Sequence, residues 1–322
     1  MQVSVVVATY NRAHLLNGTL ESLAGQQVPA GLAWEIVVVD NASRDGTSDL
    51  VRWFAKGAAV PTRCVREERP GISHARNRGV AEARGAILAF TDDDVLPAAD
   101  WVARIPEAMA RWNAQGVGGR ILPRWESPPP RWLAENKRLR ECLALMESEE
   151  SRLLSLPRRL PTIWGPNMAF RRDVLEKTGG FDPRRGLVGG RLFRGEEVDL
   201  VERALGLGFS LAYDASLVVS HRIGPDRMRR AYFRRLFFDN GQGAARIAEA
   251  GEGPRRRLAA PPWLYRAAAT GLPKWIGRRL LGRRDAFEAQ LAWLESLGAL
   301  SGYRAARRAA ADPARRSDAA EA

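Results

Sequence analysis

Short apolar runs alternate with stretches of helical spacing along the first hundred residues. Residues 3–9 form a β-branched run that predicts a buried strand, and leucines then recur at helical spacing over residues 15–23. The unit repeats, with a predicted strand over residues 34–40 and a helix with apolar residues at 50, 51 and 54. A third predicted helix, residues 71–84, stops at Gly85 before a strand over residues 86–91. This alternation predicts an α/β, Rossmann-like architecture, a mostly parallel sheet flanked by helices.

Polar residues gather where each of these strands ends. Residues 9–12 follow the first strand, Asp40 closes the second, and three consecutive aspartates at residues 92–94 follow the third. Ligands of open α/β sheets bind at the carboxyl ends of the strands. We therefore expect the three polar clusters to converge on one site.

The alternation of predicted strands and helices becomes less regular after residue 94. A proline-rich passage at residues 127–130 precedes a polar run at 132–154, which predicts a helix that covers the site or lies on its acceptor side. Further strands are predicted within residues 163–170 and 211–219. Beyond His221 the sequence predicts basic, alanine-rich helices that fray after about residue 309.

Composition and charge narrow the choice of partners. The 322 residues are 45% hydrophobic, which excludes a wholly disordered chain, and carry a formal net charge of +13. Residues after His221 hold 21 basic and 10 acidic side chains, so this end alone contributes +11. A basic end on a nearly neutral body points to an anionic partner such as lipid headgroups, nucleic acid or a phosphorylated ligand. Two cysteines are too few for a disulfide framework or a multi-cysteine zinc site.

Neither a membrane-spanning helix nor a signal peptide is expected. No apolar stretch of about 18 residues runs without a charge or a breaker. The N-terminus also lacks the positively charged region that precedes the apolar part of a signal peptide.

Two acidic clusters carry the candidate chemistry. The aspartates at residues 92–94 can chelate a hard divalent cation that also binds phosphate oxygens, or they can cap the next helix. The run at residues 195–200 places adjacent acids before an apolar helix, where one can act as a general base or the helix dipole can favour them. Three histidines make an all-protein zinc site a poor alternative, so we expect Mg²⁺ or Mn²⁺ bridged to nucleotide phosphates.

Single polar residues leave similar alternatives. Asp40 can accept a hydrogen bond from a ligand N–H, or it can cap the loop at residues 41–47. Arg76 and Arg78 lie in the N-terminal half of a predicted helix, a position that suits a diphosphate or simply a charged surface.

Several common motifs are missing. The sequence has no Gly-x-Gly-x-x-Gly between its first strand and helix and no Gly-x-x-x-x-Gly-Lys-Ser/Thr loop, which disfavours a dehydrogenase or a P-loop enzyme. It also lacks the Gly-x-Ser-x-Gly elbow that carries the nucleophile of many hydrolases. A sugar-phosphate nucleotidyltransferase would need a glycine-rich triphosphate loop that residues 8–12 do not provide.

Taken in order and spacing, four motifs resemble those of the family 2 glycosyltransferases of the GT-A fold. They are Val5–Arg12, Val37–Thr47, Ala75–Gly79 and Phe90–Asp94. The acceptor-side half of that family is similar to residues 165–172, 179–182 and 195–200. The resemblance implies a GT-A domain over residues 1–224, with a nucleotide-sugar half (1–115) and an acceptor half (116–224). A basic helical region would follow at 225–322, with its last residues disordered.

The resemblance also implies which residues form the site. Those for the nucleotide sugar are Thr9, Tyr10, Asn11, Arg12, Asp40, Arg76, Asp92 and Asp93. Those for the metal, Mg²⁺ or Mn²⁺, are Asp92, Asp94 and His221, although a lone histidine after a strand can also be structural. The catalytic base would be Glu197, where the family usually has aspartate, with Glu196 and Asp199 as alternatives.

The implied reaction is a hexosyl transfer from a nucleoside diphosphate sugar, of the UDP type, by one in-line displacement that inverts the anomeric carbon. A carboxylate would take the proton of the acceptor hydroxyl while the cation stabilises the leaving diphosphate. The expected acceptor is a glycan or a lipid-linked glycan in cell-surface polysaccharide or glycolipid synthesis. The expected location is the cytoplasm or the inner face of the cell membrane.

The basic C-terminal region has three interpretations. Nucleic-acid binding would rest on charge and on a few interleaved aromatic residues, and no nucleic acid is expected. An amphipathic helix on an anionic membrane is a better match to the aromatic and basic residues at 229–238 and 263–284. A solvated helical face is the third interpretation.

Overall fold

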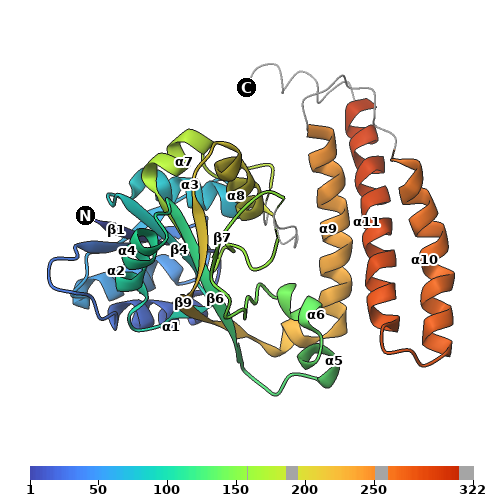
Figure 1. The fold of residues 1–322 in the computed structure, drawn as a ribbon, viewed down its shortest axis with the longest axis horizontal. Coiled ribbons are helices and arrows are strands. Elements are labelled where there is room, and N and C mark those ends of the chain that lie inside the picture. The colour runs from blue at the N-terminus through green and yellow to red at the C-terminus, as the bar shows by residue number, and fades with distance from the viewer. Residues whose placement is uncertain (158, 186–194, 251–259, 312–322) are drawn as a thin grey trace. The chain divides into compact units, whose positions relative to one another are not determined.

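The computed structural model describes residues 1–157, 159–185, 195–250 and 260–311. Two compact units divide the chain, the first comprising Met1–Pro183 with Gly195–Met228 and the second containing the helices after Met228. The sequence predicted a boundary at residue 224, within the link between the last strand of the first unit and those helices (Figure 1). The predicted fraying near the C-terminus lies mostly outside the described residues.

Within the described residues of the first unit, nine strands form one sheet. Its order is β3-β2-β1-β4-β8-β6-β9-β5, and β7 pairs with β9 (Figure 1). The strands are β1 (Val3–Thr9), β2 (Trp34–Asp40), β3 (Thr62–Arg66), β4 (Ile87–Asp92), β5 (Val95–Pro97), β6 (Gly116–Trp125), β7 (Arg152–Leu153), β8 (Met168–Arg171) and β9 (Leu211–Ile223). The pairs β1–β2, β1–β4 and β2–β3 are parallel, whereas β8 runs antiparallel to β4 and β6. The sheet is therefore parallel in its N-terminal part, as predicted, and mixed beyond it.

Helices flank this sheet, as the alternating pattern predicted. They are α1 (Ala13–Ala24), α2 (Thr47–Gly57), α3 (Ile72–Glu82), α4 (Trp101–Arg111), α5 (Arg131–Ala134), α6 (Lys137–Glu141), α7 (Arg172–Thr178) and α8 (Glu196–Gly206). A 3₁₀ helix, η1 (Pro225–Met228), follows β9. The prediction of one helix over residues 132–154 was wrong, because α5, α6 and the short strand β7 occupy that stretch. The predicted helices beyond His221 begin later, because β9 continues to Ile223.

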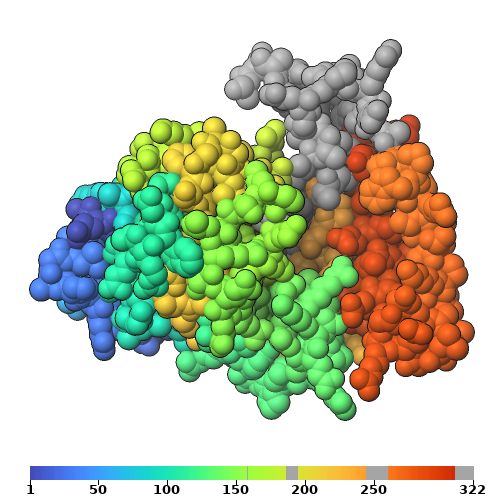
Figure 2. Space-filling view, viewed as in Figure 1, coloured from blue at the N-terminus to red at the C-terminus, as the bar shows by residue number. Residues whose placement is uncertain are grey.

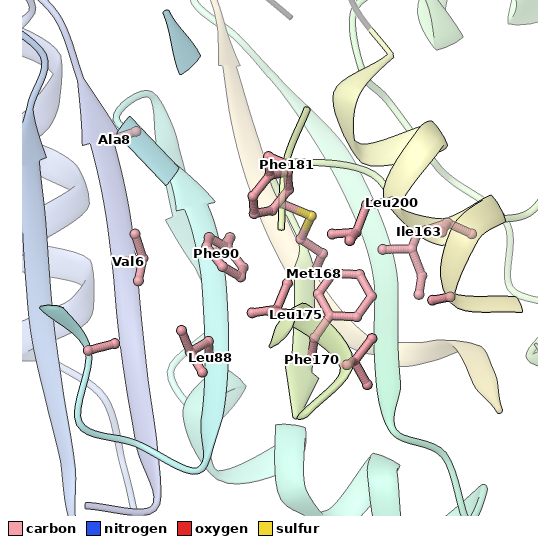
Figure 3. Packing of buried hydrophobic residues seen from close by; sticks show 14 of the residues in the cluster. Val6, Ala8, Leu88, Phe90, Ile163, Met168, Phe170, Leu175, Phe181 and Leu200 are labelled. Atoms are coloured by element: carbon pink, nitrogen blue, oxygen red, sulfur yellow. The ribbon is translucent and has the colours of Figure 1, made fainter. Parts of the chain in front are cut away.

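The core of the first unit lies between this sheet and its helices. Alternate residues of β1 and β4, such as Val6 and Phe90, belong to the same buried cluster as Phe170 and Leu200 (Figure 3). The rings of Phe90 and Phe181 pack edge to face with centroids 5.2 Å apart. All seven residues of β1 and of β2 are buried, which explains their near-continuous apolar sequence.

The second unit holds three long helices, α9 (Arg230–Ala250), α10 (Pro262–Leu280) and α11 (Ala286–Ala311). Within it, α11 contacts both α9 and α10 (Figure 1). A Cβ atom at Gly298 of α11 would lie 2.0 Å from the carbonyl oxygen of Phe238, so only glycine permits this close approach to α9. In the part of the chain that the structure describes, no helix is both long enough and apolar enough to cross a bilayer.

A buried carboxylate joins three segments at the amino end of β2, whereas the predicted site lies at the carboxyl ends of the strands. Glu35, at the start of β2, accepts hydrogen bonds from Ser4 Oγ at 2.6 Å and from the Arg84 amide at 2.8 Å, and Arg63 pairs with its other oxygen. Burial opposes ionisation of this group. The hydrogen bonds from Ser4, Arg84 and Arg63 outweigh burial and hold the pKa of Glu35 below its usual range.

We predict that Glu35→Gln lowers the free energy of unfolding at pH 7 by about 3 kcal/mol, because it leaves Arg63 without its carboxylate. Since the pKa of Glu35 is lowered in the folded protein, the ionised group stabilises the fold above the unfolded value of about 4.3. That contribution is lost as the pH falls towards the lower folded pKa. Urea unfolding between pH 3 and pH 7 should therefore show a shallower acid dependence for the variant.

The matched control is Glu68→Gln, since Glu68 pairs with Arg66 on the surface. We expect Glu68→Gln to change the free energy of unfolding by no more than about 0.5 kcal/mol. Equal unfolding free energies for the two variants would contradict a stabilising role for the buried group.

Candidate active site

The strand registers bring the three polar clusters together. Thr9 lies opposite Asp40, and Ala8 lies opposite Asp92, so β1, β2 and β4 end at the same edge of the sheet. The chain turns away from the sheet directly after each of these strands. The carboxylates at residues 92–94 thus lie beside the loop that follows β1.

Asp93 is directed into the fold and fixes the loop between β1 and α1. Its carboxylate accepts a hydrogen bond from Thr9 Oγ1 at 2.8 Å and from Arg12 Nη1 at 3.1 Å. Burial raises the pKa of Asp93 to about 7, with the carboxylates of Asp94 and Asp92 adding to the rise and Arg12 and Thr9 opposing it. Both carboxylate oxygens are engaged by the protein, so Asp93 positions the loop.

Asp94 contacts basic side chains from three segments. Its Oδ2 lies 3.1 Å from Arg12 Nη1 and 3.1 Å from Arg227 Nη1, and its Oδ1 lies 3.2 Å from His221 Nε2. Burial alone would keep this carboxyl protonated, but His221, Arg227 and Arg12 hold the pKa of Asp94 far below its usual range. Asp94 is therefore a buried carboxylate that stays ionised.

His221 and Arg227 come from the far end of the domain. His221 lies on β9 opposite Val95 of β5, and Arg227 follows in η1, with its Nη1 2.9 Å from His221 Nε2. The other imidazole nitrogen, Nδ1, is buried and has no hydrogen-bond partner among the described residues. A buried nitrogen without a partner destabilises a fold. Nε2 is the imidazole nitrogen that faces the other residues of the site, Asp94 and Arg227.

Asp94 and His221 suit a divalent cation, whereas Asp92 is turned to another partner. Two neighbouring ligands of an octahedral ion with bonds of about 2.1 Å lie about 3 Å apart. The 3.2 Å between Asp94 Oδ1 and His221 Nε2 matches that spacing, and the carboxylate and imidazole suit Mn²⁺. Asp92 Oδ1 instead lies 3.2 Å from Arg76 Nη2. In the residues that the structure describes, no group of three His, Cys, Asp or Glu side chains could hold a metal.

Arg76 joins the end of β4 to the start of α8. It projects from α3, is 4% exposed, and places Nη1 2.6 Å from Glu196 Oε1 as well as Nη2 near Asp92. Its guanidinium carbon lies 5.5 Å from the centroid of the Phe181 ring. A Cβ atom on Gly165 would lie 2.6 Å from Nη2, so the arginine fits against bare backbone there.

The acidic run at the start of α8 divides into different environments. Gly195 has a φ of 125°, which lets the chain enter the helix with Glu196 directed at Arg76. Asp199 lies one turn later and pairs with Arg203, with its Oδ2 2.7 Å from Nη2. Glu197 lies between them, half-buried. Two of the three candidate bases are thus committed to arginines.

The polar residues after β1 and β2 shape two adjoining loops. Asp40 is buried and accepts hydrogen bonds from the Ser43 amide at 2.8 Å and from Ser48 Oγ, which is the capping alternative. Despite burial, these hydrogen bonds hold the pKa of Asp40 below its usual range. Asn11, with a φ of 53°, accepts a hydrogen bond from the Arg44 amide at 2.7 Å. Tyr10 is 55% exposed beside these loops.

The sequence matches a known protein family. The family described as Glycosyl transferase family 2 matches residues 4–179. The chain belongs to glycosyltransferase family 2. The predicted family and enzyme class are confirmed.

Relatives of this family 2 member agree with the assignment. Glycosyltransferase AglE of Haloferax volcanii is 29% identical over 69% of this chain and 67% of its own length. A glucosyl-dolichyl phosphate glucuronosyltransferase of the same organism is 27% identical, over 69% and 70% of the two chains.

A solved structure supports the fold. The mannosyltransferase PcManGT from Pyrobaculum calidifontis, in complex with GDP-Man and Mn²⁺, superposes with a TM-score of 0.61 at 25% identity, covering 94% of this chain and 86% of its own. The predicted GT-A fold is confirmed.

Sequence reasoning missed two residues of the site. Arg227 follows His221 by six positions on a short proline-initiated turn, and nothing in its own pattern marks it. Phe181 belongs to a motif of the acceptor half, but its place beside Arg76 depends on the tertiary fold. Nearness to a predicted site residue was the one available signal for Arg227.

We predict that Arg76→Met destabilises the first unit by about 3 to 5 kcal/mol, because it leaves Asp92 and Glu196 without their cation in a buried site. Arg78→Met is the matched control. Arg78 lies on the same helix, partly exposed, and pairs with Glu82 at i,i+4, a contact worth about 0.3 to 0.5 kcal/mol. Chemical denaturation of both variants measures the difference, and a similar small loss in both would contradict a structural role for the buried pairing.

Proposed function

We propose that this glycosyltransferase moves a hexosyl group from a nucleoside diphosphate sugar to a hydroxyl acceptor, with a divalent cation, in one displacement that inverts the anomeric centre. The observation that carries the proposal is the Asp94–His221 pair at the ends of β4 and β9. It offers one carboxylate oxygen and one imidazole nitrogen at the spacing of two neighbouring ligands. The Mn²⁺ and GDP-Man in the PcManGT structure give independent support for this chemistry.

Asp94 and His221 would hold Mn²⁺ or Mg²⁺. When bound, the cation supplies positive charge to the leaving diphosphate. Two protein ligands leave room for phosphate and water oxygens, which suits ions that keep several non-protein ligands. Asp92 would support this site through its ion pair with Arg76. Asp93 would support it by accepting hydrogen bonds from Thr9, at the end of β1, and from Arg12, in the loop that follows.

The donor would lie over the loops that follow β1 and β2. Tyr10 presents an exposed aromatic ring on which a planar base can stack. Arg12 is 45% exposed at its side chain and already lies against Asp94, which makes it the better arginine for a diphosphate contact than the buried Arg76. Asp40 and Asn11 fix the backbone that would receive the base. A UDP donor stays our prediction, with GDP as the alternative.

Glu197 is the proposed general base. It lies where the family usually has the aspartate of its base motif, directly after Glu196, whose carboxylate contacts Arg76 at 2.6 Å. Glu196 and Asp199 stay the alternatives. Glu197 would take the proton from the acceptor hydroxyl as the sugar is transferred.

The proposed acceptor is a glycan carried on a lipid phosphate. The name of the glucosyl-dolichyl phosphate relative supports this class of acceptor. An acceptor of this kind is confined to a membrane, and the +11 charge of the residues after His221 suits an anionic membrane surface. We therefore propose that the enzyme works as a peripheral protein at the inner face of the cell membrane, in cell-surface polysaccharide or glycolipid synthesis.

Asp94→Asn should abolish the part of nucleotide binding that depends on Mn²⁺. Wild type at a hundredfold excess of ligand over its Kd should gain about 2.7 kcal/mol of stability. The measurement is a thermal-shift panel of UDP, GDP and their sugars, with and without Mn²⁺, scored as the increment that Mn²⁺ adds. Asp49→Asn, on the surface of α2, is the control. Asp94 also contacts three basic side chains, so a lower Tm of Asp94→Asn without ligand says nothing about the metal site. If Mn²⁺ still adds its increment to the Tm of the variant with nucleotide, the proposed metal site is wrong.

Glu197→Gln should keep donor binding and slow sugar transfer by at least about a hundredfold, the usual contribution of a general base. Glu196→Gln and Asp199→Asn are matched carboxylate-to-amide variants in the same helical turn. Transfer is measured by release of nucleoside diphosphate, and the anomeric configuration of the product by NMR. Normal transfer by Glu197→Gln with a hundredfold loss in Glu196→Gln would move the base to Glu196, and retention of configuration would overturn the single displacement.

A further inference from the structure

Helix α10 carries two apolar stripes, and the first is covered. Its members are spaced i, i+4, i+7 and i+11 at Leu264, Ala268, Gly271 and Trp275. Leu264 is 2% exposed, and Trp275 stacks on Trp293 of α11 with ring centroids 5.6 Å apart. This stripe forms the packing surface between α10 and α11.

The second stripe repeats the same spacing one residue later and is exposed. Its members are Tyr265, Ala269, Leu272, Ile276 and Leu280. One residue turns an α-helix by about 100°, so this stripe lies beside the first and away from α11. Tyr265 is 51%, Ile276 44% and Leu280 81% exposed. The surface of α10 is in view in Figure 2, in orange.

Single exposed apolar residues are ordinary on a soluble protein, but a continuous stripe of them marks an interaction surface. We call the second stripe the α10 face. Trp263, 66% exposed, and Leu281, 77% exposed, are not part of it, because the helical turn places each of them about 160° around the helix from Tyr265 of the stripe.

Cations flank the α10 face and follow it. Arg266 and Arg279 are exposed next to the stripe, and Arg283 and Arg284 are exposed just after the helix. Residues 262–285 contain a single acid, Asp285, which pairs with Arg278 at 2.7 Å and Arg283 at 3.5 Å. The helix thus combines an apolar surface with an excess of positive charge.

We propose that the α10 face is the surface by which this protein lies on an anionic membrane, with its apolar side chains at the headgroup–acyl boundary and its arginines on lipid phosphates. The proposal deepens the peripheral location argued above by naming the surface that makes the contact. Tyrosine, here Tyr265, favours that boundary because one part of its side chain is apolar and another can bond to water. Arginines at the edge can extend their charged ends to the phosphates.

The charge of the α10 face selects lipid over the other occupants. A second copy of the chain bound face to face would bring like cations together, since both surfaces of such a dimer are the same. A spanning role is unsupported, because α10 does not meet the length and apolarity of a spanning helix. An anionic lipid surface supplies both the apolar layer and the negative charge.

Helix α9 does not share this role, although its sequence predicted the same contact. Phe233, Leu236 and Phe237 are buried, and Arg230 and Arg234 lie over the ring of Phe287 with guanidinium carbons 5.1 Å and 5.9 Å from its centroid. The contacts of Arg230 and Arg234 with Phe287 lie within the helical unit, where they join α9 to α11. The predicted membrane segment is therefore narrowed from the basic region as a whole to α10 and the residues just after it.

The test is co-sedimentation of the full chain with vesicles of phosphatidylcholine alone or with one quarter phosphatidylglycerol, at low and high salt. Wild type should bind the anionic vesicles, and high salt should weaken that binding. The double variant Ile276→Ser/Leu280→Ser should bind at least tenfold more weakly. Its matched control is Leu153→Ser/Leu207→Ser, which removes two exposed leucines from the first unit and should bind like wild type.

A second pair of variants tests the charge. Arg266→Gln/Arg279→Gln should weaken binding at low salt by at least tenfold, while Arg307→Gln/Arg308→Gln removes the same charge from the exposed side of α11 and should have a smaller effect. Equal loss in both pairs would mean that net charge, rather than the α10 face, governs binding.

Three other results would overturn the proposal. They are no vesicle binding by wild type, equal binding to both vesicle types at every salt concentration, and a wild-type dimer in analytical ultracentrifugation that Ile276→Ser/Leu280→Ser converts to monomer. The Mn²⁺-dependent nucleotide increment is measured on the same preparations. If wild type shows no Mn²⁺-dependent increment while its lipid binding follows the expected pattern, the proposed sugar transfer is contradicted. The proposal that the α10 face binds the membrane is then still supported.

Discussion

A row of buried carboxyl groups at the end of a buried strand is the constraint on which this structure depends. Asp93 and Asp94 are each about 95% buried, and a buried carboxylate is strongly unfavourable unless cations and hydrogen-bond donors surround it. The donors come from elements far apart in the chain: Thr9 and Arg12 after β1, His221 on β9 and Arg227 in η1. Closing these contacts requires β1, β4, β5 and β9 to be in place together, so the site and the fold form as one.

The same contacts prepare the site for its reaction. Arg12 and Arg227 concentrate positive charge around one carboxylate, which preorganises the place where a diphosphate with its cation would be bound. Asp93 and Asp94 have similar sequence surroundings but opposite environments, since Asp93 has a raised pKa and Asp94 a lowered one. Asp93 contacts Thr9 and Arg12, whereas Asp94 contacts Arg12, Arg227 and His221. Both residues lie in the turn between β4 and β5, which directs their neighbouring side chains to different partners.

The sequence predicted those parts of the molecule that local pattern determines. The strands over residues 3–9 and 34–40 were found at their predicted bounds, because continuous burial on both faces leaves an unbroken apolar run. β3 was missed because it is only partly buried and its sequence, Thr62–Arg66, lacks such a run. The polar stretch after Trp132 was misread because helical composition cannot reveal that Asn136 interrupts it by capping α6, with its side chain accepting from the Leu139 amide. Arg227 could not be found, since its role arises only when β9 lies beside β5.

Arg76 shows how tertiary contact changes the meaning of a motif. Its position in a predicted helix suggested a diphosphate ligand, but the fold buries it between Asp92 and Glu196, 120 residues apart from the latter in sequence. Arg76 therefore holds the end of β4, beside the proposed metal pair, to the first turn of α8, which carries the proposed base. A buried ion pair gives little net stability compared with apolar packing, but it fixes orientation because each charge must keep its partner. The distance between the proposed metal pair and the proposed base is thereby constrained by one guanidinium group with two fixed directions of hydrogen bonding.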